Sequence, residues 1–175
     1  MGRLARKLRG FLTVALDTPI FIYHFEKSER YFKVTQEIFS RLDTEKNFTA
    51  VTSIITLIEL TVKPLREARH DLVKEYTQKL LFDDKLTTFA VDEEIARKAA
   101  ELRANYGIKT PDAVQIATAL VAQADAFITN DAELKRIEVQ VMPQVTLDLG
   151  RRLLRCRSLS AAQIQEALKR ALLLT

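Results

Sequence analysis

Four acidic residues lie where predicted strands end or predicted helices begin. Asp17 follows an apolar, β-branched strand, and Asp131 follows a later strand. Glu59 lies on the helix after the second strand, and Asp112 lies in the first turn of another helix. All four carboxylates can reach one edge of a sheet. Converging carboxylates repel one another unless a divalent cation compensates their charge, and oxygen ligands suit Mg²⁺ or Mn²⁺. The acids therefore indicate metal-assisted hydrolysis of a phosphodiester.

Each of these acids also has a purely structural interpretation. Asp112 can stabilise a helix N-terminus through the helix dipole, Asp131 can cap a helix, and Asp17 can form an Asx-turn. Glu59 is flanked by apolar residues of its helix, where a charged side chain usually has a partner. For Glu59 the structural alternative is an ion pair with a neighbouring base.

The elements that must position these acids alternate between strand and helix. Short β-rich runs predict strands over residues 12–16, 48–51, 86–91, 126–129 and 139–142. Helical spacing predicts helices from residue 18 and over residues 31–42, 54–60, 67–81, 93–105, 113–120 and 130–137. This alternation predicts an α/β fold with a parallel sheet covered by helices on both faces, and ligands bind at the edge where such strands end.

Capping residues predict where several of these helices begin and end. The expected N-caps are Thr18, Thr52 or Ser53, Asp92 and Thr110. The expected helix ends are at Pro64 and at Gly107.

The 175-residue chain divides into an acidic body and two basic ends. Residues 1–10 contain four Lys or Arg and no acid, and residues 151–175 contain six against one acid. The remaining 17 bases and 22 acids give residues 11–150 a net charge of −5, although the whole chain is +4. We expect a basic arm over 1–10, one domain over 11–150, and a basic linker with an amphipathic helix over 151–175. The basic ends suit nucleic-acid phosphates, but solvated arms share this composition.

The composition also excludes several classes of protein. The longest apolar runs fall short of a membrane span, and the N-terminus lacks a signal peptide, so we expect a soluble, cytoplasmic protein with no membrane partner. The single Cys cannot form an internal disulfide, and one Cys with two His in the whole chain is too few for a Cys/His zinc site. A metal site in this chain must therefore be built from carboxylates.

Four segments carry a resemblance to a known family: LTVALDT, SIITLIEL, YGIKTPDAVQIATAL and AFITNDAELKRI. Together, over residues 11–149, they resemble PIN-domain ribonucleases, and most closely VapC-type toxins. The resemblance implies a three-layer fold with a mostly parallel sheet, to which the C-terminal helix would be an addition. It also implies cleavage of single-stranded RNA, a homodimer and a small antitoxin. By resemblance, the acids that act in catalysis and bind Mg²⁺ or Mn²⁺ are Asp17, Glu59, Asp112 and Asp131. The residues that line the site would be Thr18 and Thr129.

Two other functions compete with a metal-dependent endoribonuclease. The first is a non-catalytic PIN-like module that binds RNA or a basic peptide, which the acidic body favours. The second is another acid-rich α/β phosphate enzyme, such as a haloacid-dehalogenase-like phosphatase or a receiver domain. The phosphatase pattern needs a second acid two residues after the first, where this chain has Pro19.

Overall fold

The computed structural model describes residues 8, 10–131, 134 and 144–146. Its strands form one sheet in the order β3-β2-β1-β4-β5, and every neighbouring pair is parallel. The strands are β1 (Thr13–Leu16), β2 (Thr49–Ser53), β3 (Leu86–Phe89), β4 (Ala126–Thr129) and β5 (Gln144–Thr146). The predicted α/β class with a parallel sheet is confirmed, and all pairs among the described strands are parallel. The strand predicted over 139–142, the C-terminal helix and the basic ends apart from Leu8 and Gly10 lie outside the described residues.

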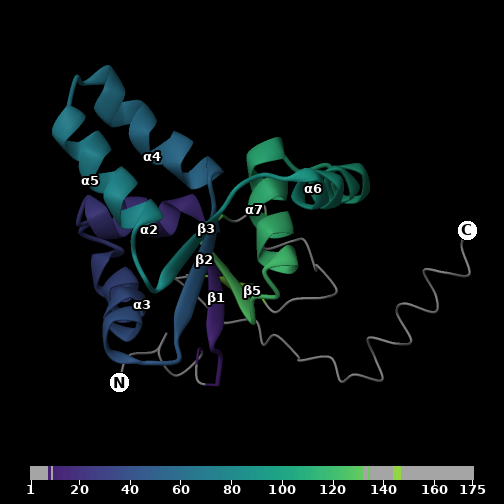
Figure 1. The fold of residues 1–175 in the computed structure, drawn as a ribbon, viewed down its shortest axis with the longest axis horizontal. Coiled ribbons are helices and arrows are strands. Elements are labelled where there is room, and N and C mark those ends of the chain that lie inside the picture. Colours follow the sequence, from purple (N-terminus) through teal and green to yellow (C-terminus); the bar gives the residue numbers. More distant parts are fainter. Residues whose placement is uncertain (1–7, 9, 132–133, 135–143, 147–175) are drawn as a thin grey trace, which may run out of the picture.

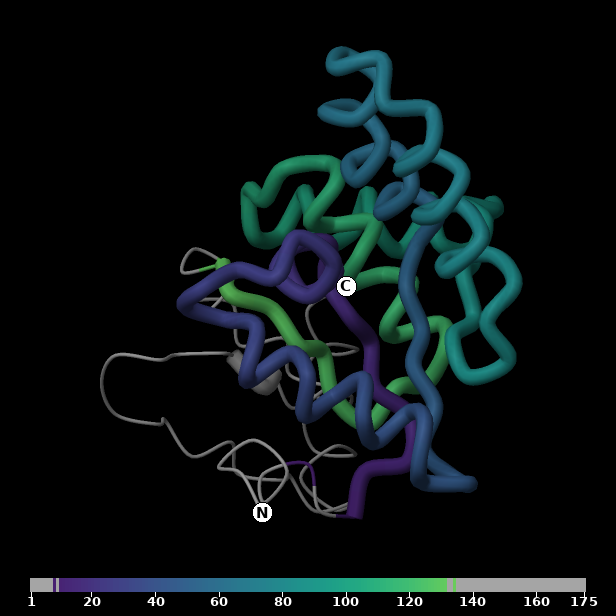
Figure 2. The backbone as a smooth tube through the Cα atoms, turned by 90° about the vertical axis from the view of Figure 1, so that its left-hand side faces the viewer, coloured from purple at the N-terminus to yellow at the C-terminus, as the bar shows by residue number. Residues whose placement is uncertain are grey.

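Helices cover both faces of this sheet (Figure 1). The described helices are α2 (Thr18–Phe25), α3 (Phe32–Thr44), α4 (Ile55–Arg66), α5 (His70–Leu81), α6 (Glu93–Tyr106) and α7 (Thr110–Val121). Helices α2 to α5 lie on one side of the sheet, and α6 and α7 lie on the other (Figure 1). The α4–α5 hairpin extends beyond the end of the sheet (Figures 1 and 2).

The core consists of two apolar layers that the strands separate. Val14 and Leu16 of β1 pack with α2, α3 and α5, whereas Ala15 packs with α6 and α7. Ile128 and Phe127 of β4 divide between the layers in the same way. Successive side chains of a strand point to opposite faces, so a sheet buried on both faces needs continuous apolar strands. This requirement explains the unbroken apolar runs in the sequence.

Two of the predicted helix boundaries are confirmed. Asp92 caps α6 by accepting a hydrogen bond from the Ile95 N–H at 2.9 Å. Gly107 ends the same helix in the left-handed conformation, with φ of 67°. Glycine adopts this backbone conformation at little cost, which makes it the usual residue at this position.

The other predicted boundaries are wrong by one to several residues. Asp17 rather than Thr18 caps α2, and Lys109 rather than Thr110 is the N-cap of α7. At α4 the N-cap is Ile54, whose side chain makes no capping hydrogen bond. Of the two predicted caps, the Ser53 hydroxyl accepts the Ile55 N–H at 3.3 Å, and the Thr52 hydroxyl donates to the Leu16 carbonyl.

The connection between α4 and α5 also differs from the prediction. Helix α4 continues past Pro64 to Arg66, since losing one N–H near the end of a helix costs only one hydrogen bond. Ala68 then adopts a positive φ of 53°, which interrupts the helical path. Helix α5 consequently begins at His70, three residues later than predicted.

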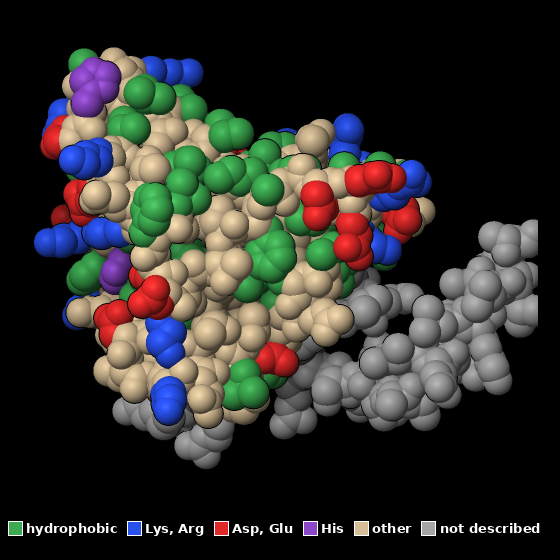
Figure 3. Space-filling model, viewed as in Figure 1, with side chains coloured by type: hydrophobic (Ala, Val, Ile, Leu, Met, Phe, Trp, Pro, Cys, Tyr) green, Lys and Arg blue, Asp and Glu red, His purple; other side chains and the backbone are tan. Residues whose placement is uncertain are grey.

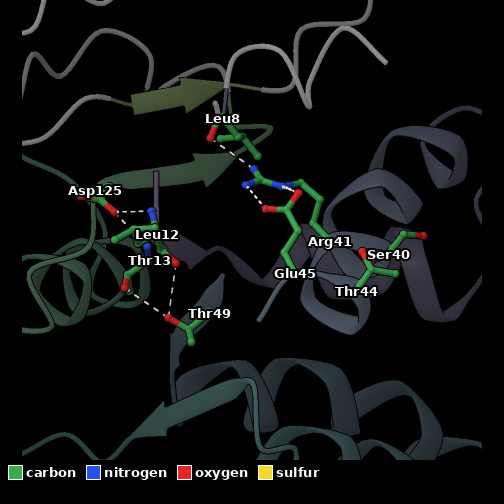
Figure 4. Close-up of polar contacts among 9 residues, drawn as sticks. All are labelled: Leu8, Leu12, Thr13, Ser40, Arg41, Thr44, Glu45, Thr49 and Asp125. Carbon is green, nitrogen blue, oxygen red and sulfur yellow. Dashed lines mark hydrogen bonds and ion pairs between the residues drawn. The ribbon is translucent and has the colours of Figure 1, made fainter. Parts of the chain in front are cut away.

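Side-chain hydrogen bonds hold both the start of β1 and the preceding segment (Figure 4). Asp125 Oδ2 accepts the N–H groups of Leu12 and Thr13 at 2.7 and 2.8 Å, and the Asp125 N–H donates to the Thr13 carbonyl. The Arg41 guanidinium pairs with Glu45 and donates to the Leu8 carbonyl at 3.2 Å. These contacts fix the chain that leads into Asp17.

Replacing Asp125 with Ala is expected to lower the free energy of unfolding by about 1–3 kcal/mol, because two N–H groups lose a charged acceptor. Asp125→Asn keeps one acceptor oxygen and should lose about half as much. Urea denaturation of the three proteins measures the effect. Equal stabilities would show that the hydrogen bonds from Leu12 and Thr13 to Asp125 contribute nothing to stability.

Within the described residues, no helix combines the length and the apolar character needed to cross a lipid bilayer.

Candidate functional site

The candidate site lies at the carboxyl edge of the sheet, where the strand order reverses. From β1 the chain leads to β2 and β3 on one side, and β4 and β5 lie on the other side. Ligands of open parallel sheets bind at such a reversal. Asp17 follows β1 directly, and Thr129 ends β4, with Asp131 two residues beyond. Helix α4 follows β2 and so begins at this edge, whereas α7 runs back along the sheet to the start of β4 and so begins there too (Figure 1). Helix α4 carries Glu59, and α7 carries Asp112.

Asp17 is the most buried acid of this group, with only 5% of its surface exposed. Its Oδ1 accepts the Thr18 N–H at 2.9 Å, and its Oδ2 accepts the Thr129 hydroxyl at 2.6 Å. Both oxygens therefore have protein partners, and the side chain is fixed at the N-terminus of α2. The helix dipole there favours a negative charge.

Burial raises the pKa of Asp17 from 3.8 to about 6, although the hydrogen bonds from Thr129 and Thr18 oppose the shift. The nearby negative charges of Asp112 and Glu59 raise the same pKa further. Three of the four predicted site acids thus interact electrostatically in the folded chain. A cation bound between these carboxylates would reduce the repulsion between their negative charges.

Two threonines connect the acids in pairs. Thr18 donates its N–H to Asp17 and its hydroxyl to Glu59 Oε2. The Thr129 hydroxyl donates to Asp17 and accepts the Asp131 N–H at 3.0 Å. Thr18 and Thr129 therefore lie between the acids. Asp131 is joined to the site through its main chain.

Glu59 lies on the exposed side of α4, and Asp112 is partly buried in the first turn of α7. In the described part of the chain, the recorded partner of Glu59 is the Thr18 hydroxyl rather than a base. Among the described residues, the structure therefore does not show the ion pair with a base that was the structural alternative for Glu59.

The sequence analysis missed a buried polar side chain behind the acids. Gln115 of α7 is 3% exposed, and its amide nitrogen donates to Thr56 Oγ1 at 2.7 Å and to Thr18 Oγ1 at 3.1 Å. Its amide oxygen accepts the Ser53 N–H at 3.3 Å. A usable signal was present, because Gln115 is a polar residue in an apolar helix, three positions after Asp112 and so on the same helical face.

The chemistry of the available donors fits a hard divalent cation. Carboxylate and hydroxyl oxygens are the groups that Mg²⁺ and Mn²⁺ prefer. In residues 10–131 and the other described positions, no three Asp, Glu, His or Cys side chains form a ready metal cage. Mg²⁺ usually keeps several waters and takes only one or two carboxylates directly. A hydrated ion near Asp17, held partly through water, is therefore compatible with these acids.

Comparisons with solved structures support the fold. A toxin–antitoxin complex from Klebsiella pneumoniae is 22% identical over 71% of this chain and 92% of that one, with a TM-score of 0.53. DNA-bound VapBC from Salmonella typhimurium is 18% identical over 77% and 98%, with a TM-score of 0.58. VapBC2 from Rickettsia felis, bound to a promoter DNA fragment, is 19% identical over 78% and 99%, with a TM-score of 0.57.

None of the curated proteins matches the sequence significantly. The family model of the PIN domain matches residues 14–140, a segment that contains all four acids, both threonines and Gln115. This match covers most of the chain, and the protein therefore belongs to the PIN domain family.

Proposed function

We propose that this protein is a Mg²⁺- or Mn²⁺-dependent endoribonuclease that cleaves single-stranded RNA, and that it is the toxin of a toxin–antitoxin pair. The observation that carries this proposal is the buried Asp17 carboxylate, on which Asp112 and Glu59 act with like charge at the strand-order reversal. The PIN family match adds support, because nuclease activity is typical of that family.

Asp17, Glu59, Asp112 and Asp131 are the residues proposed to hold the cation. When bound, a divalent cation orients a phosphodiester, lowers the pKa of a water and stabilises the leaving oxygen. Thr18 and Thr129 keep the carboxylates in place through the hydrogen bonds described above. The basic residues at the two ends of the chain would add affinity for a polyanion.

The experiment that tests the substrate compares four nucleic acids of one sequence with Mn²⁺: single-stranded RNA, single-stranded DNA, duplex RNA and duplex DNA. We expect fast cleavage of single-stranded RNA alone. Preferential cleavage of DNA or of a duplex would contradict the proposed substrate, and no cleavage of any would contradict the proposed activity.

An exposed apolar stripe on α4 supports a protein partner. Ile58, Val62 and Leu65 are 57%, 39% and 53% exposed and follow one another at helical spacing. Hydrophobic side chains gather on the face that α4 and α5 present (Figure 3). An apolar stripe on a projecting hairpin is costly in water unless another chain covers it. We propose that this chain is covered there in an assembly, either by a second copy or by an antitoxin.

Leu65→Glu places a charge within this stripe and should weaken that assembly at least about 10-fold, since an unpaired charge is costly in an apolar contact. Light scattering of the purified protein, alone and co-expressed with the product of an adjacent gene, measures the masses. An unchanged assembly in the variant would contradict a role for the stripe.

A second candidate function is a non-catalytic module that binds RNA or a basic peptide, and the acidic body favours the basic peptide. Residues 11–150 carry a net charge of −5, which attracts a basic partner and repels nucleic acid. Salt-sensitive capture of a basic peptide, without cleavage of RNA at any Mn²⁺ concentration, would favour this alternative.

A further inference from the structure

The orientation of the Gln115 amide is fixed by one neighbour that can only donate a hydrogen bond. The Ser53 N–H can only donate, so the amide oxygen of Gln115 must face it. The amide nitrogen then faces the hydroxyl oxygens of Thr56 and Thr18 and donates one hydrogen to each. All four of these residues are buried, with at most 3% of their surface exposed. Water therefore has little access to replace any of these hydrogen bonds.

The hydroxyl protons follow from the same reasoning. The Thr52 hydroxyl donates to the Leu16 carbonyl at 2.9 Å, so across the 2.8 Å contact Thr56 must donate to Thr52. The Thr56 hydroxyl therefore donates its only hydrogen bond to Thr52, and its oxygen accepts a hydrogen bond from the Gln115 amide. The Thr18 oxygen also accepts a hydrogen bond from the Gln115 amide. The Thr18 hydroxyl therefore donates its own proton in a hydrogen bond to the charged oxygen of Glu59.

From these contacts we infer that Gln115 is a positioning residue that orients the Thr18 hydroxyl toward Glu59 and so holds that carboxylate for a divalent cation. The inference rests on the proposed metal site but not on the choice of RNA as substrate. Without the Gln115 amide, the Thr56 oxygen lacks a donor and lies 3.2 Å from the Thr18 oxygen. The Thr56 oxygen then competes with Glu59 for the Thr18 proton, so the Thr18 hydroxyl is no longer oriented toward Glu59 alone and holds that carboxylate less firmly.

The test measures Mn²⁺ binding to the metal-free protein by calorimetry, with urea unfolding of each variant alongside. Gln115→Met keeps the length of the side chain and removes the amide. We expect Mn²⁺ affinity to fall about 10–100-fold, the range found when a group that supports a metal ligand is removed. Thr18→Val should cause a similar fall. The double variant should bind no more than about 2-fold more weakly than the weaker single variant, because Gln115 acts through Thr18.

Thr118→Val is the matched control. Thr118 is a buried polar residue of α7, three positions after Gln115, and its hydroxyl has no hydrogen-bond partner among the described residues. This variant should bind Mn²⁺ as the wild type does. A parallel loss of affinity in the control would indicate a general effect of changing α7 and would overturn the inference.

The remaining outcomes also decide the question. A folded Gln115→Met protein with wild-type Mn²⁺ affinity, or independent losses in the double variant, would overturn the inference. If Gln115→Met does not fold, unchanged affinity in Thr18→Val overturns it and a 10-fold loss supports it. A wild type that binds no Mn²⁺ contradicts both the inference and the metal site. Mn²⁺ binding without RNA cleavage contradicts the proposed activity alone.

Discussion

Replacing Asp17 with Asn is expected to stabilise the metal-free protein by about 3 kcal/mol near pH 8, which corresponds to roughly 6–12 °C in Tm. The Asp17 carboxylate must be ionised at this pH although it is buried beside Asp112 and Glu59. Asparagine has the same shape without the charge, and its oxygen can still accept the Thr18 N–H. The variant therefore removes a cost of folding.

The pH dependence follows from the direction of the pKa shift. Because the pKa of Asp17 rises from 3.8 to about 6 on folding, the folded protein binds the proton more tightly than the unfolded chain. This stabilising contribution is complete below about pH 4 and is lost as the pH rises through about 6. The stability difference between Asp17→Asn and the wild type should accordingly be large near pH 8 and disappear near pH 4.

Thermal unfolding from pH 4 to pH 8 measures this difference, with EDTA present to keep the protein free of metal. Asp84→Asn removes the same charge at an exposed position between α5 and β3 and should change Tm little at any pH. Addition of Mn²⁺ should stabilise the wild type but not Asp17→Asn. A lower Tm for metal-free Asp17→Asn near pH 8 would contradict the description of Asp17 as a buried charge whose hydrogen bonds do not offset the cost of its burial.

Replacing Asp112 with Asn is expected to lower the rate of RNA cleavage by at least about 100-fold, a loss typical of removing a group that holds a catalytic metal. The fold should be unaffected. Loss of a first-turn acid costs less than about 1 kcal/mol, and the neighbouring Asp17 is relieved of a repulsive charge. Single-turnover cleavage and thermal unfolding separate the two effects.

Glu94→Gln is the control for Asp112→Asn, because Glu94 is also an acid in the first turn of a helix, here α6. Glu94→Gln removes the same interaction with a helix dipole and should leave cleavage within about 2-fold of the wild type. Equal rates for Asp112→Asn and Glu94→Gln would mean that Asp112 has only the structural role that its position in the helix allows.

The sequence allowed prediction of the sheet and of the acids at its edge because both follow from local patterns. An apolar β-branched run followed by Asp17 indicates a strand end, and parallel strands bring their carboxyl ends to one edge. Asp112 was placed from the Thr-Pro-Asp sequence that begins α7. These inferences require only the alternation of strand and helix.

The hydrogen bonds among the site residues could not be predicted in this way. The contacts of Gln115 with Ser53, Thr56 and Thr18 join α7 to β2, α4 and α2, and they depend on how these elements pack. The cap of α2 shifted for a similar reason. Asp17 lies at the junction of β1 and α2, where its carboxylate accepts hydrogen bonds from both the Thr18 N–H of the helix and the Thr129 hydroxyl.

The measurement that tests the proposed metal-dependent activity most directly is cleavage of an end-labelled single-stranded RNA by the wild-type protein, in Mn²⁺ and in EDTA, with analysis of the product ends. Hydrolysis by a metal-activated water predicts cleavage in Mn²⁺ only, and products that carry linear phosphates. Cleavage that persists in EDTA, or products that end in a 2′,3′-cyclic phosphate, would contradict a metal-dependent site built on Asp17, Glu59, Asp112 and Asp131.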